Sequence, residues 1–410
     1  MSEQALSDVK VLDLTWYIAG PYCTKLLADY GADVVKVERP GAGDPARSLS
    51  PFFKDDPHPE KSGLFAHLNT NKKSITLNLK SAAGNKIFRE LVRDVDILVE
   101  SFSPRVMSSL GLSYDELEAV NPGLVMTSIS NFGQSGPYRD FKSSELILYG
   151  MGGAMSWDGL PEREPLKKGG TVVLFSSGSH AAAATMVALI AARAQGTGRP
   201  FQTKGQHVDI SLFETQLVSI DRRMSGLVFY QYNKEVTPRI GPRGLGIPYG
   251  PYPCQDGHFD AAGGWTMWPR IARMIGRPDL ANDPRWATAE GQTSAESREE
   301  FDAIYLSWLM ERTKGQCTEA GQAAGVLCGP VNSSGDLIND PHWKVRAFWA
   351  EVEHPVTGRL TYPGAPAKMS ETPWQVRNPA PLLGQHNHEI YGRLGYSKED
   401  LAKLRVSGVI

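Results

Sequence analysis

Residues 9–38 read VKVLDLTWYIAGPYCTKLLADYGADVVKVE, and this stretch decides the fold class. Residues 9–15 form a β-rich segment, a helical segment opens at 19–21 (AGP) and stops at Gly31, and a second strand follows at 33–38. A strand, a helix and a strand within about 30 residues form a βαβ unit, which implies parallel strands joined by a right-handed crossover. The sequence therefore predicts an open α/β sheet.

The same alternation continues over the first half of the chain. Further strand and helix signals follow at 74–79, 87–92, 96–100, 114–120, 125–130 and 207–218. This pattern predicts a doubly wound, Rossmann-like large domain over residues 1–224. A dinucleotide is not expected in it, because the first turn (WYIAGP, 16–21) has one glycine where the fingerprint needs three.

The rest of the chain divides by composition into four predicted segments. Residues 225–257 are rich in Gly, Pro and Tyr, which is typical of a linker or an active-site loop rather than regular structure. Strand-like and helical pieces over 258–330 predict a small α/β domain. Residues 331–386 predict a return linker, and 387–410 a helical segment that rejoins the large domain.

The length and charge of the chain limit the number of domains and the kinds of partner that we expect. The chain has 410 residues and a mass of 44.9 kDa, enough for two or three domains at about 150 residues each. It has 41% hydrophobic and 21% charged residues, as expected of a soluble globular protein and not of a disordered one. The formal net charge of −2 offers no basic excess, so nucleic acid is not an expected partner.

The location of the protein is also constrained by composition. The N-terminal MSEQA has neither the basic nor the apolar part of a signal sequence, which predicts a cytoplasmic protein. The longest nearly apolar run, 180–192, is shorter than the roughly 18 residues that cross a bilayer, so it predicts a buried helix and no membrane association. Because no CxxC pair occurs, no metal site is expected, and the cysteines are assigned to core packing: Cys23, Cys254, Cys317 and Cys328.

Several motifs recur in a known order and spacing. They are VLDLT (11–15) with AGP (19–21), GADVVKVER (31–39) with GD (43–44), NKKS (71–74), NFGQSGP (131–137), GTGR (196–199), CGPV (328–331) and APLLG (380–384). Together they resemble the family III CoA-transferases (CaiB/BaiF), which include formyl-CoA transferase. The resemblance covers nearly the whole chain. It implies two chains wound through one another as interlocked rings, with coenzyme A or acyl-CoA as substrate and no permanently bound cofactor.

Three basic residues are candidates for CoA contacts: Arg39, and the two lysines Lys72 and Lys142, which match family positions near the nucleotide. Arg39 is the strongest candidate for a CoA contact, because its planar guanidinium can chelate phosphate and stack on adenine. The alternative for Arg39 is an ion pair with Glu38 or with a neighbouring acid.

The resemblance implies a catalytic aspartate that this chain lacks. In the family, that carboxylate attacks the thioester, forming an enzyme anhydride and then an enzyme–CoA thioester. It stands four residues before the glycine of an alanine-rich helix, and here that glycine is Gly178 and the position is Leu174. The racemase branch needs the same aspartate and a histidine near Ser144, so it loses both bases.

Three residues near Leu174 are possible substitutes. Ser176 with His180 is a conceivable nucleophile and base, and the alternative is a helix cap and a packed histidine. Glu145 matches a family acidic position, and its alternative role is an ion pair with Lys142.

The missing aspartate suggests that another polypeptide supplies the chemistry. Some family members are heteromers, among them succinyl-CoA:(R)-benzylsuccinate CoA-transferase, whose one subunit lacks the aspartate and whose sister retains it. The first hypothesis is that this chain is such a non-catalytic subunit, with a homologous sister as its partner. The alternatives are a homodimeric acyl-CoA enzyme with altered chemistry and a catalytically dead CoA-binding or regulatory protein. The insertion PFQTK (200–204) is predicted to lie at the surface.

Overall fold

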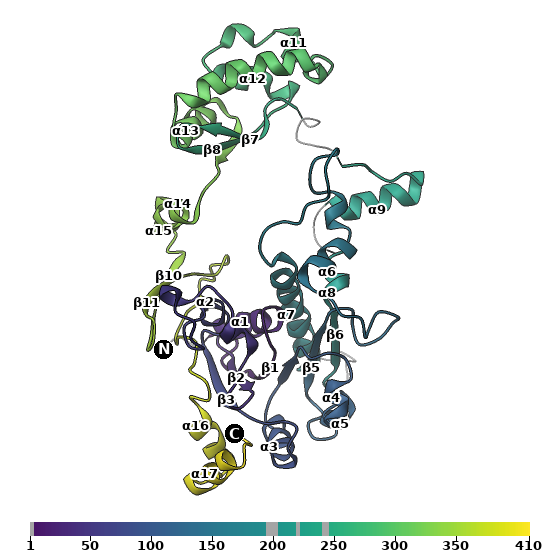
Figure 1. The fold of residues 1–410 in the computed structure, drawn as a ribbon, viewed down its shortest axis with the longest axis vertical. Helices are drawn as coiled ribbons and strands as arrows, with labels where there is room; N and C mark the ends of the chain where they lie inside the picture. The colour runs from purple at the N-terminus through teal and green to yellow at the C-terminus, as the bar shows by residue number, and fades with distance from the viewer. Residues whose placement is uncertain (1–3, 194–203, 219–221, 240–245) are drawn as a thin grey trace. The chain divides into compact units, whose positions relative to one another are not determined.

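The computed structural model describes residues 4–193, 204–218, 222–239 and 246–410 (Figure 1). Contacts divide the chain into two compact units. Unit 1 consists of Met1–Ala154, Lys167–Leu227 and Ala347–Ile410, and unit 2 of Met155–Leu166 and Val228–Arg346. Each unit is described by itself below.

Unit 1 is built on a sheet of six parallel strands. They are β1 (Lys10–Leu14), β2 (Asp33–Glu38), β3 (Lys72–Thr76), β4 (Ile97–Glu100), β5 (Val125–Ser130) and β6 (His207–Ser211). Their order is β3-β2-β1-β4-β5-β6, and every neighbouring pair is parallel. This confirms the predicted doubly wound fold. The strand order reverses between β1 and β4, which is where such sheets form a crevice at their carboxyl ends.

Helices cover both faces of this sheet (Figure 1). On one face, α1 (Ala19–Asp29) and α7 (Val172–Ala192) pack together and contact the strands. On the other, α3 (Ala82–Val92), α16 (Asn387–Arg393) and α17 (Lys398–Val406) share an apolar core with alternate strand residues. The last residue, Ile410, is buried in that core. The C-terminal helical segment thus completes the large unit.

Helix α7 contains the apolar run noted in the sequence. Among the described residues it is the one helix long and apolar enough to cross a bilayer. It packs against α1 and β5, as core helices do. The approach to α1 requires a glycine, because a Cβ on Gly178 would lie 2.6 Å from the Ala19 carbonyl oxygen. The opposite face of α7 is open, with Val187 68% and Ile190 64% exposed.

Unit 2 contains an antiparallel sheet of β7 (Tyr249–Cys254), β8 (Gly257–Ala262) and β9 (Leu327–Pro330). Helices α10 (Trp268–Met274), α12 (Ala295–Met310) and α13 (Lys314–Ala324) pack around an aromatic-rich core with it. Cys254 and Cys317 belong to this core, Cys23 is buried in unit 1, and all four cysteines are free.

The described chain contains further α-helices and one β-hairpin. They are α2 (Gly63–Leu68), α4 (Val106–Ser109), α5 (Tyr114–Glu118), α6 (Glu145–Met151), α8 (Leu212–Thr215), α9 (Arg222–Asn233), α11 (Pro284–Ala287), α14 (Ser334–Asn339), α15 (Pro341–Val345), β10 (Trp349–His354) and β11 (Gly358–Pro363).

Residues 225–257 are more regular than predicted, because they contain most of α9 and all of β7. A linker was predicted here instead of a strand because of the prolines of β7, Pro251 and Pro253. They are tolerated because β7 is an edge strand, where a missing N–H breaks no second ladder. The segment 331–386 is likewise not wholly irregular, since it contains α14, α15 and the β10–β11 hairpin. Most of the insertion 200–204 falls outside the described residues.

Candidate active site

A pocket of about 430 Å³ lies in unit 1 at the carboxyl ends of β1, β4 and β5. This is the crevice at the point where the strand order reverses, and its volume suits a small-molecule ligand. Its walls come from the loops after these three strands, from the segment that leads into α6 and from the first turn of α7. The lining residues are Trp16–Gly20, Ser101–Pro104, Ile129–Asn131, Arg139–Glu145, Leu148, Leu174 and Leu212.

The loop after β1 forms one wall. Its Trp16 backbone N–H donates to Ser101 Oγ at 2.9 Å, and its indole meets the Phe102 ring edge-on at 5.1 Å. Tyr17 has a left-handed backbone (φ 66°), which is uncommon for a residue with a side chain. A turn this tight needs Gly20, because a Cβ there would lie 2.3 Å from the Thr15 Cβ. The loop is therefore fixed to the end of β4.

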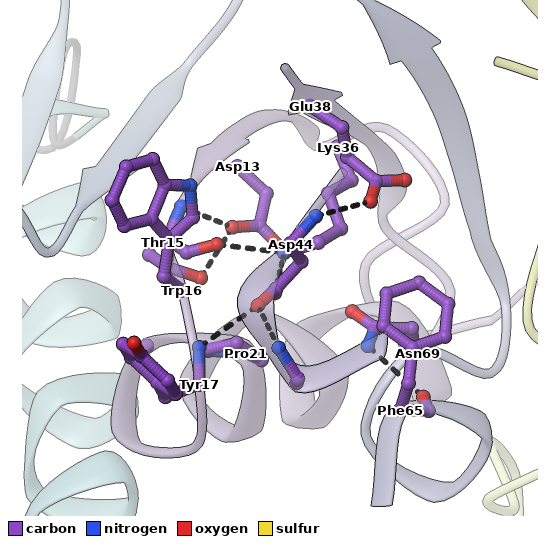
Figure 2. A network of polar contacts seen from close by, with 12 residues as sticks. Asp13, Thr15, Trp16, Tyr17, Pro21, Lys36, Glu38, Asp44, Phe65 and Asn69 are labelled. Carbon is purple, nitrogen blue, oxygen red and sulfur yellow. Dashed lines mark hydrogen bonds and ion pairs between the residues drawn. The ribbon is translucent and has the colours of Figure 1, made fainter. Parts of the chain in front are cut away.

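Buried charged side chains beside this loop hold it in place (Figure 2). The Lys36 ammonium donates to the Thr15 carbonyl oxygen at 2.7 Å and pairs with Asp44 at 2.8 Å. Asp44 Oδ1 in turn accepts the backbone N–H of Tyr17 at 3.1 Å. Both charged side chains are fully buried. The strained Tyr17 backbone is thus compensated by a hydrogen bond to a carboxylate.

Asp13 is the centre of the same network, and Lys72 is its partner. Burial by itself would raise the pKa of Asp13, but Lys36, Lys72 and two threonine hydroxyls lower it to about 2. The Lys72 ammonium donates to Asp13 at 3.0 Å, to the Pro21 carbonyl at 2.9 Å and to Asn69 at 2.9 Å. An ammonium has three donors, and all of them are used in the interior. The predicted CoA contact of Lys72 is therefore not supported by its position.

Arg39 is exposed and lies against the loop after β1. Its guanidinium carbon lies 4.6 Å from the centre of the Trp16 ring, and its Nε donates to the Gly43 carbonyl at 3.3 Å. The expected alternative, an ion pair with Glu38, does not form, because Glu38 is bound by the buried Arg47 at 2.8 Å. Arg39 is exposed beside Trp16, which is one of the residues that line the pocket, so its charge is accessible from solvent, and its contact with a CoA phosphate stays a prediction.

Lys142 lies in the pocket wall and is exposed. Within the described part of the chain it has no ion-pair partner. Glu145 pairs instead with Lys167 at 3.4 Å.

Leu174 lies in the first turn of α7 and lines the pocket. The carboxylate of Glu145 accepts the backbone N–H groups of Val173 (3.0 Å) and Leu174 (3.2 Å). These are donors that a helix leaves unpaired at its start, and a negative charge there is favourable. Glu145 therefore acts as a cap for α7. The structure brings Glu145 and Leu174 together in one wall of the pocket, and the leucine contributes no titratable group.

Ser176 and His180 do not form a nucleophile and base. His180 Nδ1 lies 2.8 Å from the Ser176 carbonyl oxygen, one turn earlier in α7, so this nitrogen donates to the helix backbone. The neighbouring Ser177 shares a hydrogen bond with Thr215 at 2.6 Å. His180 is thus bonded to its own helix, and among the described residues no hydrogen bond joins its ring to the Ser176 hydroxyl.

Two polar residues at the strand ends were missed by sequence reasoning. Glu100, the last residue of β4, is 3% exposed, and burial raises its pKa to about 7 despite hydrogen bonds from Ser128 and the Phe102 N–H. Ser130, the last residue of β5, is 6% exposed and lines the pocket, and its hydroxyl has no hydrogen-bond partner among the described residues. A polar residue closing a buried strand at this edge was the signal available in the sequence.

The fold is a doubly wound α/β sheet with a pocket at the carboxyl ends of its strands, the place where such sheets bind ligands. Residues 6–387 match CoA-transferase family III, so the chain belongs to that family. It is 35% identical over 408 residues to the succinyl-CoA–D-citramalate CoA-transferase of Chloroflexus aurantiacus, covering 99% of this chain and 98% of that protein. It is also 35% identical over 419 residues to the formyl-CoA:oxalate CoA-transferase of Streptomyces coelicolor, covering 100% of both chains.

A solved structure agrees with this assignment. The CAIB/BAIF family protein from Brucella suis superposes with a TM-score of 0.83 at 28% sequence identity, covering 96% of this chain and 100% of that one. The protein is thus a family III CoA-transferase by sequence and by fold.

Proposed function

We propose that this chain is the non-catalytic subunit of a heteromeric CoA-transferase that moves CoA from succinyl-CoA to an aryl-succinate such as benzylsuccinate. The observation that carries the proposal is Leu174. It lies in the pocket wall at the start of α7, where the family resemblance implies the nucleophilic aspartate. A leucine has no lone pair for attack on a thioester, so the nucleophile has to come from elsewhere.

The other residues near Leu174 support this reading. The Glu145 carboxylate is held by the α7 backbone and by Lys167, and the His180 Nδ1 atom is bonded to its own helix. A nucleophilic hydroxyl needs an adjacent base, and Ser176 has none in this geometry.

In the proposed complex, the homologous sister chain supplies the carboxylate. Its oxygen attacks the acyl carbon of succinyl-CoA, the carbon–sulfur bond breaks, and an anhydride and CoA thiolate form. The thiolate then attacks the enzyme's carboxyl carbon and releases succinate. The acceptor carboxylate attacks the resulting enzyme thioester, and the thiolate returns to the acceptor's acyl carbon. In this chain, Arg39 is our candidate for holding a CoA phosphate, because it is exposed beside Trp16.

Exposed apolar side chains on unit 1 are consistent with a partner chain. On α6, Leu146 is 54% and Ile147 47% exposed, and on α7 Val187 and Ile190 are 68% and 64% exposed. We take these four side chains as candidates for part of an interface with another chain. An interlocked dimer of two similar chains would cover them.

The donor in this proposal is supported by one relative. The Chloroflexus aurantiacus protein acts, by its name, with succinyl-CoA and D-citramalate. The aryl-succinate acceptor rests on the resemblance to the heteromeric enzyme.

Two experiments test the proposal. Pull-down of the tagged chain from its host, followed by mass spectrometry, is expected to recover a homologous chain with an aspartate at the position of Leu174. Exchange of CoA between succinyl-CoA and benzylsuccinate is then measured with the pair and with this chain alone. Activity of the pair only is expected. Recovery of this chain alone, or exchange by this chain alone, would overturn the proposal and favour a homodimeric enzyme or a CoA-binding protein.

Restoring the nucleophile gives a sharper result. The variant Leu174→Asp is expected to acquire exchange activity, whereas Leu174→Asn, similar in size and polarity but without a carboxylate, is expected to remain inactive. If both variants stay inactive while coenzyme A still binds, the loss of activity does not lie at this residue alone.

A further inference from the structure

A buried carboxyl group closes β4 at the edge of the pocket. Glu100 is 3% exposed, and among the described residues no lysine or arginine forms an ion pair with it. Burial, and to a lesser extent the negative charge of Asp209, raises its pKa to about 7. The Glu100 side chain therefore carries a proton at pH values where exposed carboxyl groups are ionised.

This carboxyl group holds the loop that follows β4. Its Oε2 atom accepts the backbone N–H of Phe102 at 2.8 Å. In the same loop, Ser101 Oγ accepts the Trp16 N–H at 2.9 Å, and the Phe102 ring meets the Trp16 indole edge-on. The residues from Ser101 to Pro104 line the pocket. Glu100 thus fixes one wall of the pocket and, through that wall, the loop after β1.

A chain of hydrogen bonds joins this carboxyl group to the surface. Ser128, which is paired with Glu100 in the neighbouring strand β5, bonds to the carboxyl group. The Ser128 Oγ atom lies 2.8 Å from Nε2 of His207, the first residue of β6. His207 is exposed, and its ring stacks on Tyr114 with the ring centres 5.6 Å apart. We call Glu100, Ser128 and His207 the proton chain.

The serine hydroxyl has a single proton, and this couples the two ends of the proton chain. When Glu100 is protonated, its O–H donates to Ser128 Oγ, and the Ser128 O–H donates to the lone pair on Nε2 of a neutral His207. When Glu100 is ionised, the Ser128 O–H donates to the carboxylate instead, and Nε2 loses its donor. Burial lowers the pKa of His207 below its usual 6.5, which favours the neutral, accepting imidazole. The proton chain as a whole therefore favours the protonated carboxyl group.

The charged groups that face the histidine are also acids. Asp209 lies on the same strand and Asp115 on α5, and both raise the pKa of His207, although by less than burial lowers it. The Asp209 carboxylate is held by the backbone N–H of Gln134 at 2.9 Å. Among the described residues, no lysine or arginine forms an ion pair with Asp115 or Asp209. The charge at the pocket edge thus depends on the proton of Glu100.

We propose that Glu100 is a positioning residue whose proton keeps the pocket wall 101–104 closed. The protonated carboxyl group is satisfied by the Phe102 N–H and by Ser128, so the closed loop leaves it no unpaired atom. The ionised group is disfavoured by burial and is solvated once the loop opens, so ionisation shifts the loop toward the open form.

The proton chain gives this proton a route to water. The Glu100 proton passes to Ser128 Oγ, the Ser128 proton passes to Nε2 of His207, and the exposed imidazole releases the proton on its other nitrogen to water. The serine ends unchanged and the histidine ends neutral, so one proton in total has left. This control of the pocket wall does not depend on Leu174 or on a sister chain, and its failure would leave the proposed function untouched.

Hydrogen exchange of the full chain, followed by mass spectrometry, tests the inference. Peptides that cover 101–104 are compared with peptides from β1, and each rate is divided by the intrinsic exchange rate at the same pH. The pKa of Glu100 is about 7 in the closed loop and an ordinary value near 4.5 once the loop is open, so the protection of 101–104 is expected to fall by about five- to twentyfold from pH 5.5 to pH 7.5. The loop is expected to exchange faster than β1 at every pH, because it opens without unfolding of the sheet.

Two variants and a control assign the effect. Glu100→Gln keeps an acceptor for the Phe102 N–H but cannot ionise, so its protection is expected to be independent of pH. His207→Phe keeps the stacking on Tyr114 and frees the Ser128 hydroxyl for the carboxylate, so the fall in protection is expected to end about one pH unit lower. The exposed control Glu235→Gln is expected to behave as the parent chain does.

Four results would overturn the inference. They are a fall in protection of less than fivefold in the parent chain, pH-dependent protection in Glu100→Gln, an unshifted pH profile in His207→Phe, and equal protection of 101–104 and β1. A histidine that only packs against its neighbours would give the unshifted profile. If Glu100→Gln does not fold, the parent chain and His207→Phe decide the question.

Discussion

The buried charge network under the pocket loop makes a strong prediction for Asp13→Asn. An asparagine side chain has the size of aspartate and keeps some of its hydrogen bonds. The substitution removes the negative charge that faces Lys72 at 3.0 Å and Lys36 at 3.9 Å. All three side chains are fully buried. Removing one partner from a buried ion pair leaves an uncompensated charge and costs about 3–5 kcal/mol.

The pKa of Asp13 supports this magnitude. It lies at about 2 instead of the usual 3.8, which corresponds to about 2.5 kcal/mol in favour of the ionised form. We therefore expect Asp13→Asn to lower the free energy of unfolding by about 3 kcal/mol at pH 7. A lowered pKa stabilises the fold at pH values above about 4, and this contribution is lost as the pH falls from about 4 through 2. Asp13→Asn has no carboxyl group at this position, so its stability does not show this loss at low pH.

Urea unfolding, followed by tryptophan fluorescence, measures the effect. With a slope of about 3 kcal/mol per molar, the midpoint of unit 1 is expected to fall by about 1 M. The matched control is Asp94→Asn, which removes the same charge from an exposed pair with Lys10 and is expected to cost about 0.5 kcal/mol or less.

A double variant isolates the cause. In Asp13→Asn with Lys72→Met, the unpaired ammonium is gone, so we expect at least about 1 kcal/mol of the lost stability to return. A cost below about 1 kcal/mol for Asp13→Asn, or a double variant as unstable as the sum of the two singles, would refute the reasoning.

Three further predictions concern the cap of α7, the buried end of β4 and the exposed Arg39. Glu145→Ala removes the cap from α7 and is expected to lower the free energy of unfolding, measured in urea, by about 2 kcal/mol. The exposed control Glu235→Ala is expected to change it by less than about 0.5 kcal/mol. Equal effects of the two substitutions would contradict the capping role. Burial raises the pKa of Glu100 to about 7, so the folded chain keeps a proton on this carboxyl group that the unfolded chain releases above about pH 4.5. The free energy of unfolding therefore falls by up to about 3 kcal/mol as the pH rises from 4.5 to 7. Glu100→Gln is expected to remove that fall when unfolding is compared at pH 5 and pH 8, and identical pH dependence in both proteins would disprove it. Arg39→Ala is expected to weaken coenzyme A binding about tenfold in calorimetry with no change in the urea midpoint, while Lys80→Ala leaves binding unchanged; full affinity in the Arg39 variant would exclude the proposed contact.

Much of the large unit could be predicted from local patterns. Strands 33–38 and 125–130 were predicted with the bounds that β2 and β5 have, because buried parallel strands read as short apolar runs. The strand β3 begins two residues earlier than the expected 74, at Lys72, since a buried lysine reads as polar. The strand β7 was not predicted because its prolines argue against a central strand. Prolines are compatible with an edge strand, but only the sheet order shows that β7 lies at an edge.

The site shows the limit of the same reasoning. A lysine in a family motif suggested a ligand contact for Lys72, and only the fold shows that Asp13, from a strand 59 positions away, holds its ammonium inside. Glu145 looked like a spare carboxylate, and its distance to the α7 backbone shows that it is a cap. Ser130 attracted no attention, because an unpaired hydroxyl can be recognised only when every neighbour is placed.

The sequence by itself determined the doubly wound sheet, the membership of the CoA-transferase family and the leucine at position 174, because these depend on residue order and on short-range periodicity. Only the tertiary structure decided which charged side chains are paired in the interior and which face the pocket. That distinction arises from hydrogen bonds and burial between segments far apart in the chain, and those contacts set both the pKa of Asp13 and the availability of Lys142 to a ligand.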